Sequence, residues 1–182
     1  MGWSTHHSTG LIHYAPQHSY RGYTLLVSNS GNIAHLIDME GRICHEWRSD
    51  EGISYGYLLP NGNLLLRTGP AAEETSFLSR PERNLVPGGG RTTSGAILEL
   101  DWDSNVVWEY RYPFLHHDFE RLPNGNTLVL VWKSLPEELA TQVKGGYTDG
   151  SEPGQMLGDA VMEVTAGGEV VDEWRSWEHL SL

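Results

Sequence analysis

The feature that most constrains this chain is an internal repeat built on the sequence Leu-Pro-Asn-Gly-Asn. It occurs at residues 59–63 and again at residues 122–126, so the second copy follows the first by 63 residues. A second unit consists of an apolar run, a turn and another run that ends near a tryptophan. This second unit occurs three times, beginning at Ile33, Ala96 and Ala160. Repetition at a fixed spacing is typical of an architecture made of one stacked structural unit.

The repeated units divide into short strands joined by tight turns. Asn-Gly is a strong hairpin signal, and the second unit has its own turns at residues 39–41, 103–104 and 166–168. Residues 127–132 read TLVLVW and are apolar at both alternations, which predicts a strand covered on both faces. Sheets that stack on one another provide such cover. The repeat therefore predicts an all-β fold made of four-stranded antiparallel blades, as in a β-propeller.

The repeat also predicts how the chain is divided. We expect an N-terminal arm at residues 1–22 and a partial β-propeller of about three blades at residues 23–182. Residues 23–48 supply three strands of a blade that lacks its inner strand, and residues 54–111 and 116–175 each supply four strands. Closed propellers have about 4–8 blades, so we expect self-association or a second polypeptide to complete the ring. A small β-sandwich with coincidental repeats is the alternative fold.

Charge and composition exclude several classes of function. The chain has 12 Lys and Arg against 24 Asp and Glu, a net charge of −12, which argues against a nucleic-acid partner. A single cysteine, Cys44, forms neither an intramolecular disulfide nor a cysteine zinc cluster, and we expect a small packed side chain there. No apolar run approaches the roughly 18 residues of a membrane span, and the first residues do not resemble a secretory signal. These observations predict a soluble, cytoplasmic protein without a membrane partner.

The strongest chemical signal is the sequence His116-His117-Asp118, at the start of the inner strand of the last blade. It is expected to lie beneath two long connections, at residues 69–94 and 133–157. An imidazole there can act as a nucleophile or general acid, and a neighbouring carboxylate can fix its tautomer. On a regular strand His116 and Asp118 share one face and His117 takes the other, so the sequence leaves open which imidazole reacts.

Two other interpretations of the same residues are open. The imidazole can serve only as a hydrogen-bonding group between strands. A metal site on His116 and Asp118 would have two visible ligands on one face, which is few for a metal, and we expect no metal and no other cofactor.

Tryptophans end the three copies of the second unit. Trp47, Trp108 and Trp174 are predicted to lie at equivalent places on the outer strands. Aromatic side chains that repeat with the blade are expected to pack between blades rather than to form a row for carbohydrate stacking.

Four segments, in this order, resemble the arylsulfotransferase family of bacterial propeller enzymes. They read GYTLLVSNSGNIAHLIDMEGRICHEW, YLLPNGNLL, AILELDWDSNVVWEY and HHDFERLPNGNTLVLVW, and the likeness extends from about Gly22 to Trp177. The resemblance implies a six-bladed propeller that transfers a sulfuryl group from a phenolic sulfate ester to a phenol, without a nucleotide sulfate donor. A histidine is transiently sulfurylated. The family's histidine and aspartate motif before Leu-Pro-Asn-Gly falls on His116, His117 and Asp118.

The resemblance also implies partners and a second location. The partners are small molecules, an aryl sulfate and a phenol, and exported relatives make a periplasmic location the alternative. At the matching place of the preceding blade the chain has Ile53, Ser54 and Tyr55, which offer no imidazole. A non-catalytic partial propeller that acts as a binding or structural module, or an inactive fragment, is the alternative function.

Overall fold

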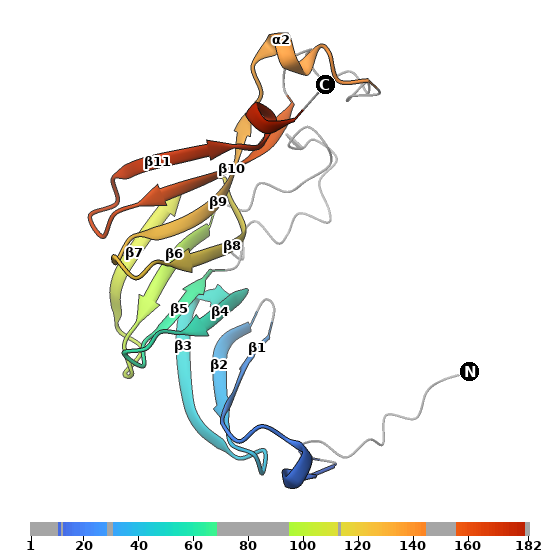
Figure 1. Cartoon of the computed structure of the whole chain (residues 1–182). Helices are drawn as coiled ribbons and strands as arrows, with labels where there is room; N and C mark the ends of the chain where they lie inside the picture. Colours follow the sequence, from blue (N-terminus) through green and yellow to red (C-terminus); the bar gives the residue numbers. More distant parts are fainter. Residues whose placement is uncertain are drawn as a thin grey trace, which may run out of the picture. The chain divides into compact units, whose positions relative to one another are not determined.

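The fold was analysed in a computed structural model of the chain (Figure 1). The model describes residues 11, 13–28, 31–68, 95–112, 114–144 and 156–180. The long connection expected at residues 69–94 lies outside these ranges. Residues 145–155 of the second long connection also lie outside them. A short helix, α2 (Glu137–Ala140), occupies part of the second connection.

The first sheet has three antiparallel strands in chain order. It follows the single turn η1 (Pro16–His18) and contains β1 (Thr24–Val27), β2 (Gly31–Ile37) and β3 (Ile43–Ile53). The outer strand β3 extends five residues beyond the predicted end of the blade and leads almost directly into the next sheet.

The other two sheets each have four strands in up-and-down order. The middle sheet contains β4 (Tyr55–Leu58), β5 (Leu64–Arg67), β6 (Gly95–Leu100) and β7 (Val106–Tyr112). The last sheet contains β8 (Leu115–Arg121), β9 (Thr127–Ser134), β10 (Leu157–Val164) and β11 (Val170–Arg175), and η3 (Ser176–His179) follows it. The chain is therefore an all-β protein whose sheets have the strand order of propeller blades, which confirms the predicted fold class.

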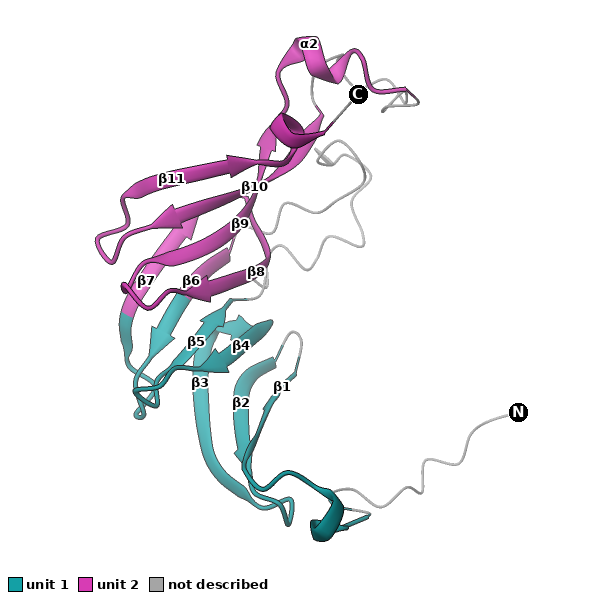
Figure 2. Ribbon diagram, in the orientation of Figure 1, with its two compact units in different colours: residues 1–69, 98–107 teal, residues 70–97, 108–182 magenta. Residues whose placement is uncertain are grey.

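The contacts divide the chain into two compact units (Figure 2). One unit comprises residues 1–69 and 98–107, and the other comprises residues 70–97 and 108–182. The candidate site and its supporting contacts lie in the second unit.

The Leu-Pro-Asn-Gly-Asn motif forms the predicted tight turn, and each polar residue in it has a role. Gly62 has φ +88°, a conformation that glycine adopts without steric cost. The Asn61 side-chain oxygen accepts a hydrogen bond from the Asn63 amide at 3.0 Å, and the Asn63 side chain donates to Glu99 at 2.7 Å. The second copy repeats these contacts with Asn124, Gly125, Asn126 and Glu163. A glutamate on the third strand therefore clamps the turn in both sheets.

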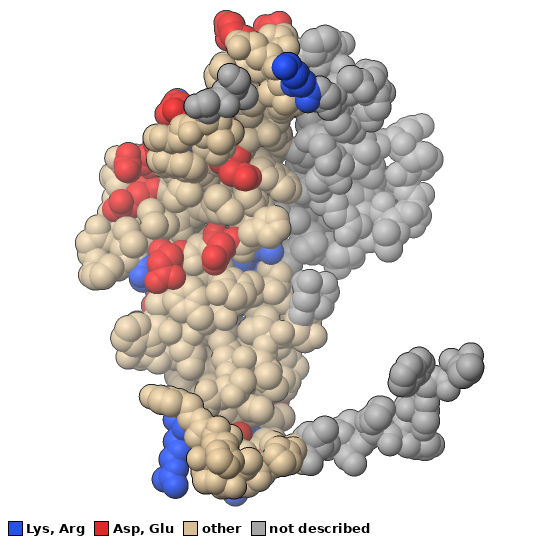
Figure 3. Space-filling model, turned by 45° about the vertical axis from the view of Figure 1, so that its right-hand side comes forward, with Lys and Arg blue, Asp and Glu red and all other residues tan. Residues whose placement is uncertain are grey.

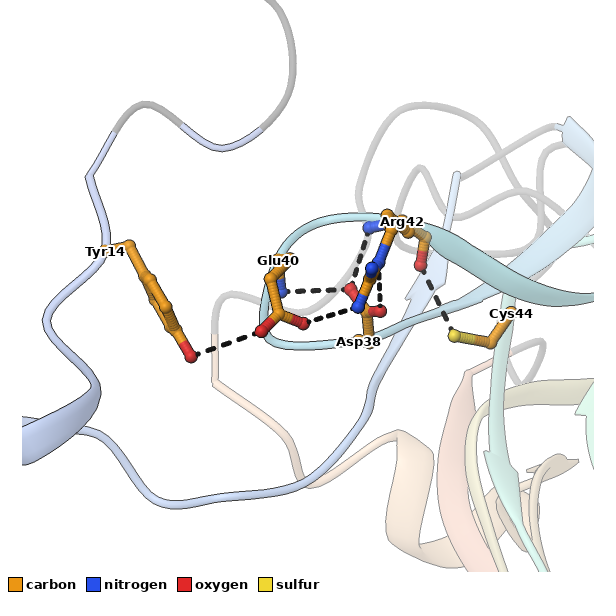
Figure 4. A network of polar contacts seen from close by, with 5 residues as sticks. All are labelled: Tyr14, Asp38, Glu40, Arg42 and Cys44. Carbon is orange, nitrogen blue, oxygen red and sulfur yellow. Dashed lines mark hydrogen bonds and ion pairs between the residues drawn. The ribbon is translucent and has the colours of Figure 1, made fainter.

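The second kind of turn joins the third and fourth strands of each blade. In the first sheet the Asp38 carboxylate accepts hydrogen bonds from the Glu40 and Arg42 amides, both at 2.9 Å (Figure 4). These amide contacts, led by that of Arg42, keep the pKa of Asp38 below its usual value. Asp101 accepts the same two contacts in the middle sheet, where the hydrogen bonds of Asn105 lower its pKa.

These turns also fix the register of the outer strands. The amides of Asp38, Asp101 and Thr165 each bond the carbonyl four residues further on, so these three positions are equivalent. Counted from them, Trp47 and Trp174 share one place, Tyr110 holds that place in the middle sheet, and Trp108 lies two residues nearer the turn. The prediction that Trp108 is equivalent to the other two tryptophans is therefore wrong. The sequence pattern located the strand but not its register.

Apolar side chains from successive strands form the core of each sheet. Leu64, Leu65 and Leu66 of β5 are all 0 % exposed, so this strand is covered on both faces. In β9 buried residues alternate with half-buried ones from Thr127 to Trp132, and none of these six is exposed. Cys44, in contrast, is exposed, and the prediction of a packed thiol is wrong. It lies at the start of an outer strand beside Ile43, which is 57 % exposed.

Charged side chains of both signs lie on the face that Figure 3 draws. Figure 3 shows Asp and Glu distributed over one face, with Lys and Arg at separate points. None of the helices in the described ranges is long and apolar enough to cross a membrane.

Candidate functional site

The His116-His117-Asp118 sequence lies in a bulge of β8. Leu115 pairs with Val131 of β9 and Phe119 pairs with Val129, so three residues of β8 stand opposite one residue of β9. The extra residues require an unusual backbone, and His117 has φ +50°. A side chain other than glycine is strained in this left-handed region, and such strain is typical of functional sites.

The bulge separates the two imidazoles by burial. His116 is 4 % exposed and stacks on Trp132 of β9, with ring centroids 4.5 Å apart and planes at 21°. His117 is exposed, and its ring lies edge-on to that of His116 at 5.1 Å. A regular strand would have placed the two rings on opposite faces, whereas the bulge brings them together.

Close polar contacts connect the two rings with a carboxylate. The His116 Nε2 atom lies 3.3 Å from Oδ1 of Asp159, which belongs to β10. The His116 Nδ1 atom lies 2.9 Å from Nδ1 of His117. Asp159, His116 and His117 are therefore connected in one line.

These contacts favour one tautomer of each ring. The negative charge of Asp159 beside Nε2 favours a proton on that atom of His116, and Nδ1 then keeps its lone pair. That lone pair accepts Nδ1–H of His117, which leaves the second lone pair of His117 on Nε2. In the described part of the chain no donor is bonded to this Nε2 atom. An exposed imidazole with its lone pair directed away from its partners can act as a nucleophile.

In the described part of the chain the Asp118 carboxylate bonds a backbone amide rather than an imidazole. Its carboxylate Oδ1 accepts the amide hydrogen of Phe119 at 2.9 Å, so it stabilises the backbone of the bulge. The carboxylate that faces an imidazole is Asp159, which sequence reasoning did not select. Asp159 of β10 pairs with Trp132 of β9. The sequence pattern does not specify this register, so it did not identify Asp159 as a neighbour of the imidazoles.

A glycine beside Asp159 allows close packing at the end of β10. A Cβ atom on Gly158 would lie 2.6 Å from Cε3 of Trp177 and 2.7 Å from Cδ1 of Leu135. Both distances are too short for ordinary contact, so only glycine permits these side chains to pack on the strand. This packing holds the segment that carries Asp159.

Within the described ranges no three His, Cys, Asp or Glu side chains are grouped to hold a metal ion.

The chain was compared with known proteins. No family model matches it, and no match was found among curated proteins. A crystal structure of a protein of unknown function from Bacteroides caccae is similar, with a TM-score of 0.47 and 14 % sequence identity. The similarity covers 88 % of this chain and 48 % of that protein, so the chain spans about half the length of this structural relative.

Proposed function

We propose that His117 is the nucleophile of a sulfuryl transfer from a phenolic sulfate ester to a phenol. The observation that carries the proposal is the line from Asp159 through His116 to His117, which leaves the His117 Nε2 lone pair exposed. The resemblance of the sequence motifs to arylsulfotransferases supports the choice of sulfate as the group transferred. His116 and Asp159 are positioning residues in this account.

In the first step the His117 Nε2 lone pair forms a bond to sulfur. The bond between sulfur and the aryl oxygen breaks, and its electron pair leaves with the phenolate, which takes a proton from water. The proton on His117 Nδ1 moves to His116 Nδ1, and the resulting imidazolium is stabilised by the Asp159 carboxylate. In the second step a phenol oxygen attacks sulfur, the sulfur–nitrogen bond breaks and its electron pair returns to His117 Nε2. The extra proton on His116 Nδ1 moves back to His117 Nδ1, and the phenol proton is taken by the hydroxide formed in the first step.

The first step can be tested without turnover. The chain is incubated with 4-nitrophenyl sulfate, digested under neutral conditions, and examined by mass spectrometry for an added SO₃ group. We expect the group on His117, and we expect added phenol to remove it. The His117→Ala variant should carry no label, whereas His13→Ala, which changes an exposed histidine outside the site, should label like the wild type.

Circular dichroism checks that each variant keeps its β structure. A label on another residue, or no label on a folded chain at saturating donor, would contradict the proposal.

A further inference from the structure

The outer strand of one blade contacts the turn of the following blade, and this contact occurs twice. In the first unit the Trp47 indole N–H donates to the Asp101 carbonyl at 3.1 Å, and Trp47 is 0 % exposed. In the second unit the Trp108 indole N–H donates to the Ala166 carbonyl at 2.8 Å. In both cases the acceptor belongs to the turn between the third and fourth strands of the following blade.

Neighbouring side chains complete each contact. His45 of β3 stacks on Trp102 in the β6–β7 turn, with ring centroids 3.7 Å apart. Tyr110 of β7 is 8 % exposed, and it lies 4.0 Å from where a Cβ atom of Gly168 in the β10–β11 turn would be. Trp47 and Tyr110 hold the same position in their outer strands, and each is therefore covered by the turn between the third and fourth strands of the next blade.

The same place on β11 is uncovered in the described structure. Trp174 is 46 % exposed, and its ring stacks on His179 at 4.8 Å. Within the described ranges its indole N–H donates to no acceptor. Within the described residues, one turn of this kind is contacted by no outer strand. It is the turn at residues 38–42, between β2 and β3, and there the Asp38 carbonyl accepts only the Gly41 amide.

We propose that Trp174 of one copy binds the β2–β3 turn of a second copy, donating its indole N–H to a carbonyl of that turn. The contact of Trp47, which holds the same place as Trp174, is the model for this interface, because the turn at residues 38–42 has the same hydrogen bonds as the turn that receives Trp47. The interface is head-to-tail, so each copy offers both surfaces.

The N-terminal arm competes with the second copy for this turn. Leu11 lies 3.2 Å from where a Cβ atom of Gly41 would be, and the Tyr14 hydroxyl lies 3.5 Å from a Glu40 carboxylate oxygen (Figure 4). The arm thus covers the turn of its own copy. Loosening the arm should strengthen the association, whereas changing Trp174 should weaken it.

Sedimentation velocity over a range of concentrations tests both effects in the full chain. We expect association that strengthens with salt, because two copies of net charge −12 repel one another. Trp174→Ala should weaken it at least about tenfold, as for a tryptophan at the centre of an interface. The double change Leu11→Ala and Tyr14→Ala should strengthen it.

A matched control removes an exposed apolar side chain from a different outer strand. Val107 of β7 is 53 % exposed, and Val107→Ser should leave the association unchanged. The proposal is wrong if the wild type and the arm variant are both monomers at high concentration, or if Trp174→Ala associates as strongly as the wild type.

Discussion

The strands β4 and β8 occupy the same place in two successive blades, and they differ just before the turn. Both lead into Leu-Pro-Asn-Gly-Asn, and both turns are clamped by a glutamate. In the middle sheet β4 is regular, with Tyr55 paired to Arg67 and the Ser54 hydroxyl bonded to the Arg67 carbonyl at 3.0 Å. In the last sheet β8 is bulged at the equivalent place, and the bulge carries both histidines.

The difference separates what builds the blade from what carries the chemistry. The turn and its glutamate are the same in both blades, so they account for the fold. The strained His117 backbone occurs in one copy only and does not serve the hairpin. A departure from a repeat that costs stability is the place where a function is expected.

The largest expected effect concerns how the two strands pack. Phe119 is 4 % exposed, and the equivalent residue of β4 is Gly56, where a Cβ atom would lie 3.0 Å from the Leu65 carbonyl oxygen. Phe119→Ala should lower the free energy of unfolding by about 3–5 kcal/mol, because it removes a buried ring from the core. Denaturant unfolding measures this change. A loss below about 1 kcal/mol would show that Phe119 does not anchor the bulged strand.

The next effect distinguishes the two aspartates near the histidines. Asp159→Asn keeps the size of the side chain but removes the charge that stabilises the His116 imidazolium. We expect the rate of His117 sulfurylation by an aryl sulfate to fall about 10²-fold, and its pH profile to change. Asp118→Asn should label within a few-fold of the wild type, because Asp118 bonds the Phe119 amide rather than an imidazole. Equal losses in both variants would remove the distinction between them.

A pair of variants measures the strain in the bulge. His117→Ala and His117→Gly both remove the imidazole, but only glycine adopts φ near +50° without steric cost. We expect the glycine variant to be more stable than the alanine variant by about 1 kcal/mol, and thermal or denaturant unfolding gives the difference. If alanine is the more stable of the two, the left-handed conformation at His117 is not a source of strain.

The smallest effect comes from an ion pair within the last sheet. The Lys133 ammonium on β9 bonds Glu173 on β11, and this contact, with that of Arg175, holds the pKa of Glu173 below its usual value of 4.5. The stability it contributes is present above that value and is lost as pH falls through the lowered pKa.

Lys133→Met should therefore lower the free energy of unfolding by about 0.5–1 kcal/mol at neutral pH. The variant and the wild type should become equally stable as the solution is acidified below the lowered pKa. A difference that persists in acid would show that Lys133 stabilises the sheet by packing rather than by charge. The labelling of His117 should be unchanged in this variant.

Much of the fold follows from the sequence because hairpin turns are local. Gly62 and Gly125 take the positive φ values that an Asn-Gly turn requires, and the strands on either side lie where the alternation of residues places them. The register of the outer strands is less local. Trp108 lies two residues nearer its turn than Trp47 and Trp174 lie to theirs. The position of a residue in an outer strand is counted from the turn before it, and the spacing of the tryptophans alone does not give that position.

The candidate site was predictable only in part. The sequence identified His116 and His117 because adjacent imidazoles before a hairpin are unusual. It did not predict a bulge, because no glycine marks the position of positive φ. It did not predict Asp159 either, since that residue reaches His116 from β10, across the intervening strand β9.

The most direct test of the central claim is the tautomer of His117. Long-range ¹H–¹⁵N correlation spectra of the ¹⁵N-labelled chain distinguish a protonated ring nitrogen from one with a lone pair. We predict that His117 carries its proton on Nδ1 and its lone pair on Nε2, and that Asp159→Asn reduces the population of this tautomer. A proton on Nε2 of neutral His117 in the wild type would contradict the account, because the atom proposed to attack sulfur would then have no lone pair.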